Sequence, residues 1–288
     1  MITVDTSLMS KASGVAMRIS CIALVSSLAW LSACNPVVER RTTFPDGSPW
    51  TQIQLHGGRL HGKVKTWYAN GSLRSEANYI EGTAMGAWQT WHPNGEVEAS
   101  GAYLRGLPDG PWEVFTEEGS RVVSETFNEG VRDGLRILRR PDGRLLGVET
   151  HRQGKREGLR LIFGSDGHAT QEELFHEDQA DGLTRRWTDE GLLISTTTML
   201  KGQTHGLQVL YHSDGQKLAQ GQFHKGTRIG PWFVWTKDGE LGALSGMYTD
   251  GDRSGPLEPA DIARSGQLRE EAFPGHLAAP QLPEGLEP

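Results

Sequence analysis

The chain has little cysteine and few apolar residues, and both shortages exclude classes of protein. Its 288 residues include two cysteines, Cys21 and Cys34, so none follows position 34. The rest of the chain therefore holds no disulfide framework, thiolate metal site or cysteine nucleophile. Apolar residues make up 36% of the chain, below the roughly 45–50% typical of globular domains. This composition argues against a helical bundle or a large enzyme core.

Excess basic charge is also absent. The chain carries 29 basic and 36 acidic side chains, a net charge of −7. Without residues 1–33, which contain Lys11, Arg18 and Asp5, the count is 27 against 35, a net charge of −8. An acidic surface does not attract a polyanion, so we expect no nucleic-acid partner. It also offers no second, electrostatic anchor to anionic lipid.

No apolar run is long enough to cross a membrane as a helix. The longest, Ile19–Leu31, includes several serines and follows Arg18. A basic residue, a short apolar stretch and then small residues are typical of a secretory signal. Met9 and Met17 are alternative starts, because Met1 gives an unusually long segment before the apolar stretch.

The end of this segment, Leu31-Ser32-Ala33-Cys34, resembles the lipobox of bacterial lipoproteins. The resemblance implies that residues 1–33 are a lipoprotein signal peptide and that Cys34 is acylated, which anchors the mature protein to a membrane of the cell envelope. Asn35 at the next position favours the outer membrane of a Gram-negative bacterium, with the protein periplasmic or surface-exposed. The alternative is an ordinary signal in which Cys34 has no role.

Glycine is abundant, and its spacing shows an internal repeat. We number the positions of each repeat from its first glycine, position 0. These glycines lie 24 residues apart, at Gly62, Gly86, Gly110, Gly134, Gly158, Gly182, Gly206 and Gly230. A second glycine, always after Asn, Asp or Glu, stands at position 9: Gly71, Gly95, Gly119, Gly143, Gly167, Gly191, Gly215 and Gly239. A third stands at position 20 in six repeats, with Asp178 and Asp250 in the other two.

The spacing predicts one β-hairpin per repeat. The segments between glycines have strand length, and Asn-Gly or Asp-Gly is a strong hairpin signal because both residues tolerate positive φ. The connection around position 20, such as Glu81-Gly82, is expected to be a looser turn. Bulky residues recur at position 5 and position 17, with Arg139 and His151 as exceptions, and Met247 completes the position 17 series. Stacked repeats bury such residues in two ladders.

The predicted fold is all-β: an elongated antiparallel meander of tandem 24-residue hairpins without a helical domain. Residues 34–61 hold the lipidated N-terminus, a short linker and a half repeat with a turn at Asp46-Gly47. Residues 62–255 form eight repeats. Residues 256–288 are a degenerate cap and a disordered proline-rich tail.

The pattern from Gly86 to Val97, G-x-W-x-x-W-x-x-N-G-x-V, resembles the variant MORN repeat of bacterial proteins. The resemblance covers residues 38 to about 255. It implies a repeat architecture and a scaffold or binding role. Members are often described as antitoxin components, which implies an immunity-type antitoxin against an envelope-acting toxin as the alternative function.

No catalytic or metal site is evident in the sequence. Ten histidines are present, but those at equivalent positions, such as His61 and His205, lie in distant repeats and do not converge on one ion. They are interpreted as solvated strand residues. Carboxylates at turns, such as Glu118, Asp142 and Asp166, serve turn conformation. We therefore expect no enzyme activity, no cofactor and no metal.

The remaining candidates are three tryptophans at repeat position 2: Trp88, Trp112 and Trp232. Repeats of cell-wall-binding proteins also carry aromatics in short hairpins, although those repeats are shorter and have tyrosine doublets that this chain lacks. Packing within the sheet is the favoured interpretation, and a ligand face is the alternative. The predicted function is a membrane-anchored scaffold that engages a protein or cell-wall partner. The sequence leaves the oligomeric state open.

Overall fold

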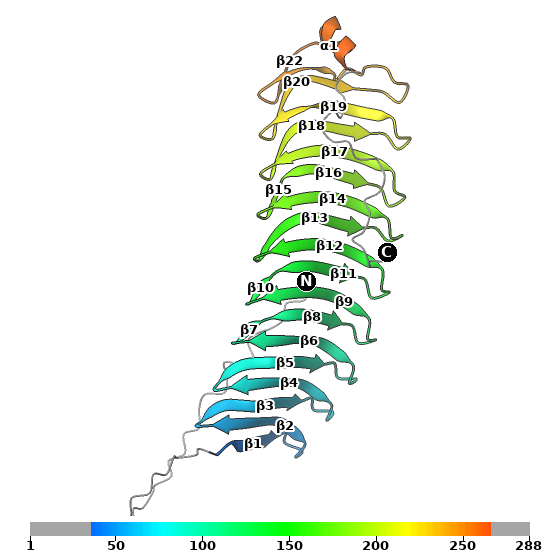
Figure 1. Ribbon diagram of the computed structural model, residues 1–288. Coiled ribbons are helices and arrows are strands. Elements are labelled where there is room, and N and C mark those ends of the chain that lie inside the picture. Colours follow the sequence, from blue (N-terminus) through cyan, green and yellow to red (C-terminus); the bar gives the residue numbers. More distant parts are fainter. Residues whose placement is uncertain (1–35, 266–288) are drawn as a thin grey trace, which may run out of the picture. The chain divides into compact units, whose positions relative to one another are not determined.

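The computed structural model describes residues 36–265. These residues belong to one compact unit and form an open antiparallel sheet of 22 strands (Figure 1). The predicted signal peptide, Cys34, Asn35 and the proline-rich tail lie outside the described residues. No helix within 36–265 has the length and apolar character needed to cross a bilayer.

The strands follow one another across the sheet in chain order, which confirms the predicted all-β meander. Their bounds are β1 (Val38–Thr43), β2 (Pro49–His56), β3 (Arg59–Trp67), β4 (Leu73–Ile80), β5 (Thr83–Trp91), β6 (Val97–Leu104), β7 (Leu107–Pro108), β8 (Gly110–Phe115), β9 (Arg121–Asn128), β10 (Val131–Arg132), β11 (Gly134–Arg139), β12 (Leu145–Arg152), β13 (Lys155–Phe163), β14 (Ala169–His176), β15 (Gln179–Ala180), β16 (Gly182–Trp187), β17 (Leu193–Leu200), β18 (Gln203–Tyr211), β19 (Lys217–His224), β20 (Thr227–Val234), β21 (Gly246–Thr249) and β22 (Asp252–Gly255). A short helix, α1 (Pro259–Arg264), follows.

The turn at position 9 has the predicted glycine conformation but a different geometry. All eight glycines there have positive φ, for example +85° at Gly71. The preceding Asn70 does not, and it instead accepts a hydrogen bond from the N–H of Ser72 at 3.0 Å. The N–H of Gly71 donates to the carbonyl of Tyr68 at 2.9 Å. This is a type I turn followed by a left-handed glycine, not a two-residue Asn-Gly turn.

The two-residue turns lie at the other end of the hairpins, where the sequence predicted a looser connection. Glu81 and Gly82 both have positive φ, +47° and +85°, and the flanking Ile80 and Thr83 pair directly. Those are the dihedrals of a type I′ turn, whose twist matches that of the strands it joins. The prediction therefore assigned the tight and the loose turn to the wrong ends of the repeat.

The glycines at position 0 bend the strands. Gly86 has φ +81°, and the pairing of β4 with β5 shifts between Ala77 and Tyr79, opposite this glycine. The same shift recurs between β12 and β13 and between β17 and β18. The strand that carries the glycine has two more residues over this stretch than its partner, an irregularity of the β-bulge type that increases the local twist.

The last repeat has one inserted residue, which corrects two sequence assignments. The loop between β20 and β21 is irregular, and Gly230 pairs with Tyr248 as Gly62 pairs with Tyr79. Tyr248, not Met247, therefore occupies the position 17 site. Likewise Gly251, with φ +93°, takes the turn position assigned to Asp250, whose φ is +49°.

The ends of the sheet also differ from the sequence expectation. β1 and β2 pair around Asp46-Gly47, so a complete hairpin stands where a half repeat was predicted. At the other end β22 pairs with β21, and α1 follows in the segment predicted as a degenerate cap.

A cluster of buried apolar residues lies near the middle of the sheet. Leu145, Val148 and Leu161, each at most 4% exposed, pack with Phe163 and Ala169 on β12–β14. Ile137, Val148 and Leu161 lie side by side in the register of β11, β12 and β13. Because strand side chains alternate between faces, the adjacent residues of these strands point to the opposite face.

Candidate functional site

One row of residues on that opposite face contains all three candidate tryptophans. The residues of this central row come from repeat positions 2 and 15, which pair across neighbouring strands. In chain order they are Ala77, Trp88, Gly101, Trp112, Glu125, Arg136, Glu149, Arg160, Glu173, Thr184, Thr197, Gln208, Gly221, Trp232 and Gly246. The same structural position is thus aromatic, then charged, then neutral and polar, then aromatic again.

The first part of the central row is an aromatic block of Trp88, Tyr103, Trp112 and Phe127. The rings of Trp88 and Trp112 stack with centroids 4.9 Å apart and planes 29° apart. Tyr103 and Phe127, from position 17, contact Trp112 edge-on at 5.3 and 5.9 Å. Each such pair contributes about 0.5–1.5 kcal/mol beyond area burial. The tryptophans therefore join the predicted position 17 ladder.

The aromatic block stays partly open to solvent. Trp88 and Trp112 are both half-buried. The indole Nε1 of Trp112 is shielded and has no hydrogen-bond partner, although an indole N–H is a donor. Burial raises the pKa of the Tyr103 phenol, so this hydroxyl stays protonated at neutral pH. The block thus combines apolar ring faces with polar hydrogens.

Trp232 occupies the same row but is only 2% exposed. Arg228 lies over its ring at 4.6 Å, and Phe223 and Tyr248 contact the ring edge-on at 5.1 and 6.2 Å. Its Nε1–H donates to the carbonyl of Gln222 at 3.2 Å. Trp232 is therefore a packing residue, and Trp88 and Trp112 are the candidates that remain accessible.

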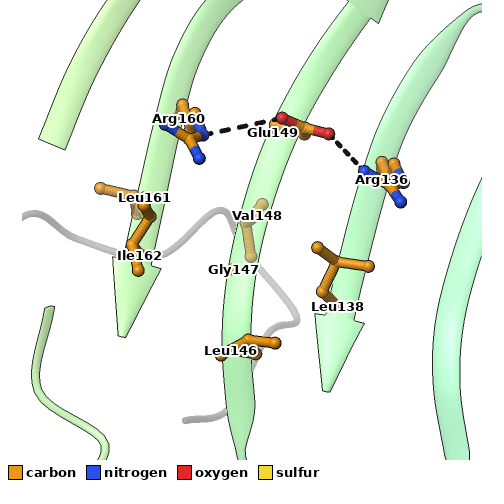
Figure 2. A pocket seen from close by; sticks show the side chains of 9 residues that line it. All are labelled: Arg136, Leu138, Leu146, Gly147, Val148, Glu149, Arg160, Leu161 and Ile162. Atoms are coloured by element: carbon orange, nitrogen blue, oxygen red, sulfur yellow. Dashed lines mark hydrogen bonds and ion pairs between the residues drawn. The ribbon is translucent and has the colours of Figure 1, made fainter. Parts of the chain in front are cut away.

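Charged residues replace the tryptophans in the middle of the row. Glu149 on β12 contacts Arg136 on β11 at 2.7 Å and Arg160 on β13 at 3.7 Å, as Figure 2 shows. Arg136 also contacts Glu125 at 3.2 Å, and Arg160 contacts Glu173 at 2.8 Å. We call these five residues the ionic ladder. Each arginine lies between two glutamates, and Glu125 also contacts Arg132 at 2.7 Å, so three carboxylates face three guanidinium groups.

A shallow hollow of about 250 Å³ lies beside the ionic ladder. Gly147 on β12 is flanked by Leu138 on β11 and Ile162 on β13, and it contributes no side chain to fill the space between them (Figure 2). The hollow is apolar on its floor and charged along one edge, where Glu149 lies. It contains no pair of carboxylates placed for acid–base chemistry.

The turn carboxylates have local structural roles. Asp142 accepts the backbone N–H of Arg144 at 3.0 Å, and Asp166 accepts that of His168 at 3.1 Å. The Arg144 N–H lowers the pKa of Asp142, and the His168 side chain lowers that of Asp166. The pKa of Glu118 is lowered by the hydroxyl of Thr116. Each therefore stabilises its own turn as a carboxylate.

Several histidines have specific contacts, which the interpretation as solvated residues missed. His92 and His212, both at position 6, lie 3.0 and 3.2 Å from the carbonyl oxygens of Phe115 and Trp235 in the following repeats. Two more, His56 and His61, meet Glu81 closely enough to hold a metal ion. Comparing equivalent positions in distant repeats could not find this cluster; comparing neighbouring strands would have done so.

Residues 60–81 match the family model described as MORN repeat variant. No curated protein matches the sequence. The matched segment runs from β3 through β4 into the following turn, and the structure repeats this unit along the sheet. Residues 60–81 are therefore similar to a MORN repeat variant, and the other hairpins of the sheet repeat the same unit.

Proposed function

We propose that this chain is a lipid-anchored scaffold of the bacterial cell envelope that binds a cell-wall glycan or a protein partner through the aromatic block. MORN repeats suggest a scaffold or binding role. The observation that carries the finer proposal is the half-buried Trp88–Trp112 stack. The protein acts by binding and not by catalysis.

The chemistry of the aromatic block supports this choice of ligand. Indole faces bind the apolar faces of sugar rings and apolar side chains, and tryptophans dominate the energetics of many interfaces. The Nε1–H of Trp112 is shielded, so the accessible part of the indole rings is what the block offers to a ligand.

The sequence before the sheet supports the anchor. Cys34 ends the lipobox-like tetrapeptide, and β1 begins at Val38. Only three residues separate the proposed lipid-bearing cysteine from the first strand. A single acyl chain gives marginal membrane binding, whereas the several chains of a lipoprotein anchor stably.

The test is co-sedimentation of the purified protein with peptidoglycan sacculi. We expect the double variant Trp88→Ala/Trp112→Ala to lose at least about tenfold in affinity, the effect of roughly 1.4 kcal/mol. Trp50→Ala is the matched control, because Trp50 is 50% exposed and contacts Phe44 at 5.8 Å, outside the aromatic block. Thermal melting verifies that the variants remain folded.

A second measurement identifies a protein partner. The anchored protein is crosslinked in its own membranes, purified, and compared with the double variant. A protein captured by the natural sequence and lost in the variant supports the block as a protein-binding site; a secreted toxin in that role would favour the immunity-type alternative. If folded Trp88→Ala/Trp112→Ala retains both sacculus binding and all captured proteins, the proposed site is wrong.

A further inference from the structure

Two histidines and a glutamate from consecutive repeats meet at the end of the hairpins where the type I′ turns lie. His56 is the last residue of β2, His61 lies in β3, and Glu81 opens the turn between β4 and β5. Each residue contributes one potential ligand atom, and these three atoms lie within 4.8 Å of one another. The Nδ1 atoms of His56 and His61 are 2.7 and 3.3 Å from Oε1 of Glu81.

The backbone holds these side chains in place. The N–H of Gly82 donates to the carbonyl of Leu60 at 2.7 Å, which fixes the Glu81-Gly82 turn against β3 beside His61. His56 and Arg59 pair across the preceding Gly57-Gly58 turn, which sets the position of His56. The cluster therefore sits on paired strands and tight turns, and rigid elements position a site precisely.

The donor atoms are in a suitable state for a metal. The Nδ1 atom of His61 is shielded from water and has no well-aligned hydrogen bond. The side chains remain 37–45% exposed, which leaves access for an ion and for water ligands.

We propose that His56, His61 and Glu81 form a binding site for a divalent transition-metal ion of the zinc class, with its remaining positions open to water. Two imidazole nitrogens and a carboxylate oxygen are a ligand set for Zn²⁺, with bonds of about 2.0–2.2 Å. Tetrahedral bonds of that length place ligand atoms about 3.3 Å apart. The His61–Glu81 separation equals this value, and the His56–Glu81 separation must widen.

The ligand set also disfavours the binding of other ions. Mg²⁺ and Ca²⁺ prefer oxygen ligands, so two imidazoles make a poor site for them. The site would tie β2, β3 and the β4–β5 turn together at the start of the sheet. Any ion that binds the folded state and not the unfolded chain raises the melting temperature.

The chain provides a matched control for this site. His205 shares the repeat position of His61, and its ring lies 5.0 Å from that of His224, close to the 5.3 Å between His56 and His61. The residue at the turn position of Glu81 is here Lys225, whose N–H lies 3.5 Å from Nδ1 of His205. This pair of histidines therefore lacks the carboxylate.

The test is calorimetric titration of ZnCl₂ into the mature chain without a polyhistidine tag. We expect one equivalent to bind, and Glu81→Gln and His61→Asn each to weaken binding by at least about tenfold, the lower end of the effect of losing an outer-sphere partner. His205→Asn/His224→Asn should bind as the natural sequence does. MgCl₂ should give no binding heat.

Thermal melting with and without ZnCl₂ is the second readout. Zinc should raise the melting temperature of the natural chain and of His205→Asn/His224→Asn, but not of Glu81→Gln. Melting without zinc shows whether each variant is folded. Equal zinc affinity in folded Glu81→Gln and the natural chain, or loss of binding only in the His205→Asn/His224→Asn variant, would overturn the proposal.

Discussion

Gly221 lies directly against the indole ring of Trp232, so closely that a Cβ atom at position 221 would overlap the ring. Gly101 has the same relationship to Trp112. Neither glycine is among the residues with positive φ. These two positions therefore require glycine because a side chain would collide with the indole ring. The turn positions require glycine because of their positive φ.

This relationship predicts that Gly221→Ala destabilises the protein. Forcing a methyl group into a packed site costs about 1–3 kcal/mol. Trp232→Ala alone should cost about 3–5 kcal/mol, because the indole is almost fully buried. In the double variant the two costs should not add, since the clash needs both side chains. Urea unfolding of all four proteins measures the coupling, and strict additivity would contradict the contact.

The turn glycines behave differently. Gly119 has φ +82° at the β8–β9 turn, where a β-branched residue is strained although the nearest side-chain atom, of Glu96, would lie 3.7 Å from a Cβ. We expect Gly119→Val to cost about 1–3 kcal/mol. Arg121→Ala is the control: its ion pair with Glu113 at 2.6 Å is exposed and worth at most about 1 kcal/mol. An unchanged melting temperature in Gly119→Val would contradict the turn assignment.

The ionic ladder predicts a position-dependent cost of removing glutamates. Glu149 is 14% exposed and lies between two arginines, so Glu149→Ala leaves both without their shared partner. We expect a loss of about 1–3 kcal/mol, below the cost at a fully buried pair. Glu113→Ala, whose partner Arg121 is exposed, should cost at most about 1 kcal/mol. Equal effects of the two substitutions in denaturant unfolding would argue against the ladder as a stabilising unit.

His151 predicts a pH dependence of stability. It is 9% exposed in the aromatic position 17 series, its Nδ1 has no hydrogen-bond partner, and burial lowers its pKa from the usual value near 6.5. The unfolded chain therefore binds a proton at this histidine at a higher pH than the folded chain does. The contribution of neutral His151 to the free energy of unfolding is complete above pH 6.5, the pKa in the unfolded chain. It is lost as the pH falls from 6.5 through the lower pKa of the folded state.

The substitution His151→Phe should remove this pH-dependent contribution to stability. The difference in unfolding free energy between the variant and the natural chain should then grow as pH falls below 6.5. Comparing the two proteins at each pH cancels the opposite contributions of His168 and His176, whose pKa values are raised by Asp166 and Glu157. A difference that stays constant between pH 5 and pH 8 would show that His151 does not titrate differently on folding.

The lipid anchor is tested by metabolic labelling. We expect palmitate to label the protein in its native host, and Cys34→Ser to abolish the labelling and release the protein from membranes. Cys21→Ser is the control, because Cys21 lies within the predicted signal peptide. Labelling that persists in Cys34→Ser would exclude this residue as the acylation site.

The sequence by itself determined the 24-residue hairpin repeat. Gly71 and its equivalents mark one turn because only glycine adopts their left-handed conformation without strain. A period of 24 residues with such glycines leaves room for two strands and two turns. Three strands are broken near Asp109, Asp133 and Asp181, which the glycine spacing did not indicate.

Tertiary structure decided the rest, because the sequence of one repeat does not show which residues of neighbouring strands lie opposite each other. The sequence could not show that Tyr248 replaces Met247, since a single insertion shifts every later side chain to the other face. Nor could it show that Trp232 is buried while Trp112, at the same repeat position, is partly accessible, because that depends on Arg228 and Tyr248. The His56–His61–Glu81 cluster depends in the same way on turns from two repeats lying side by side.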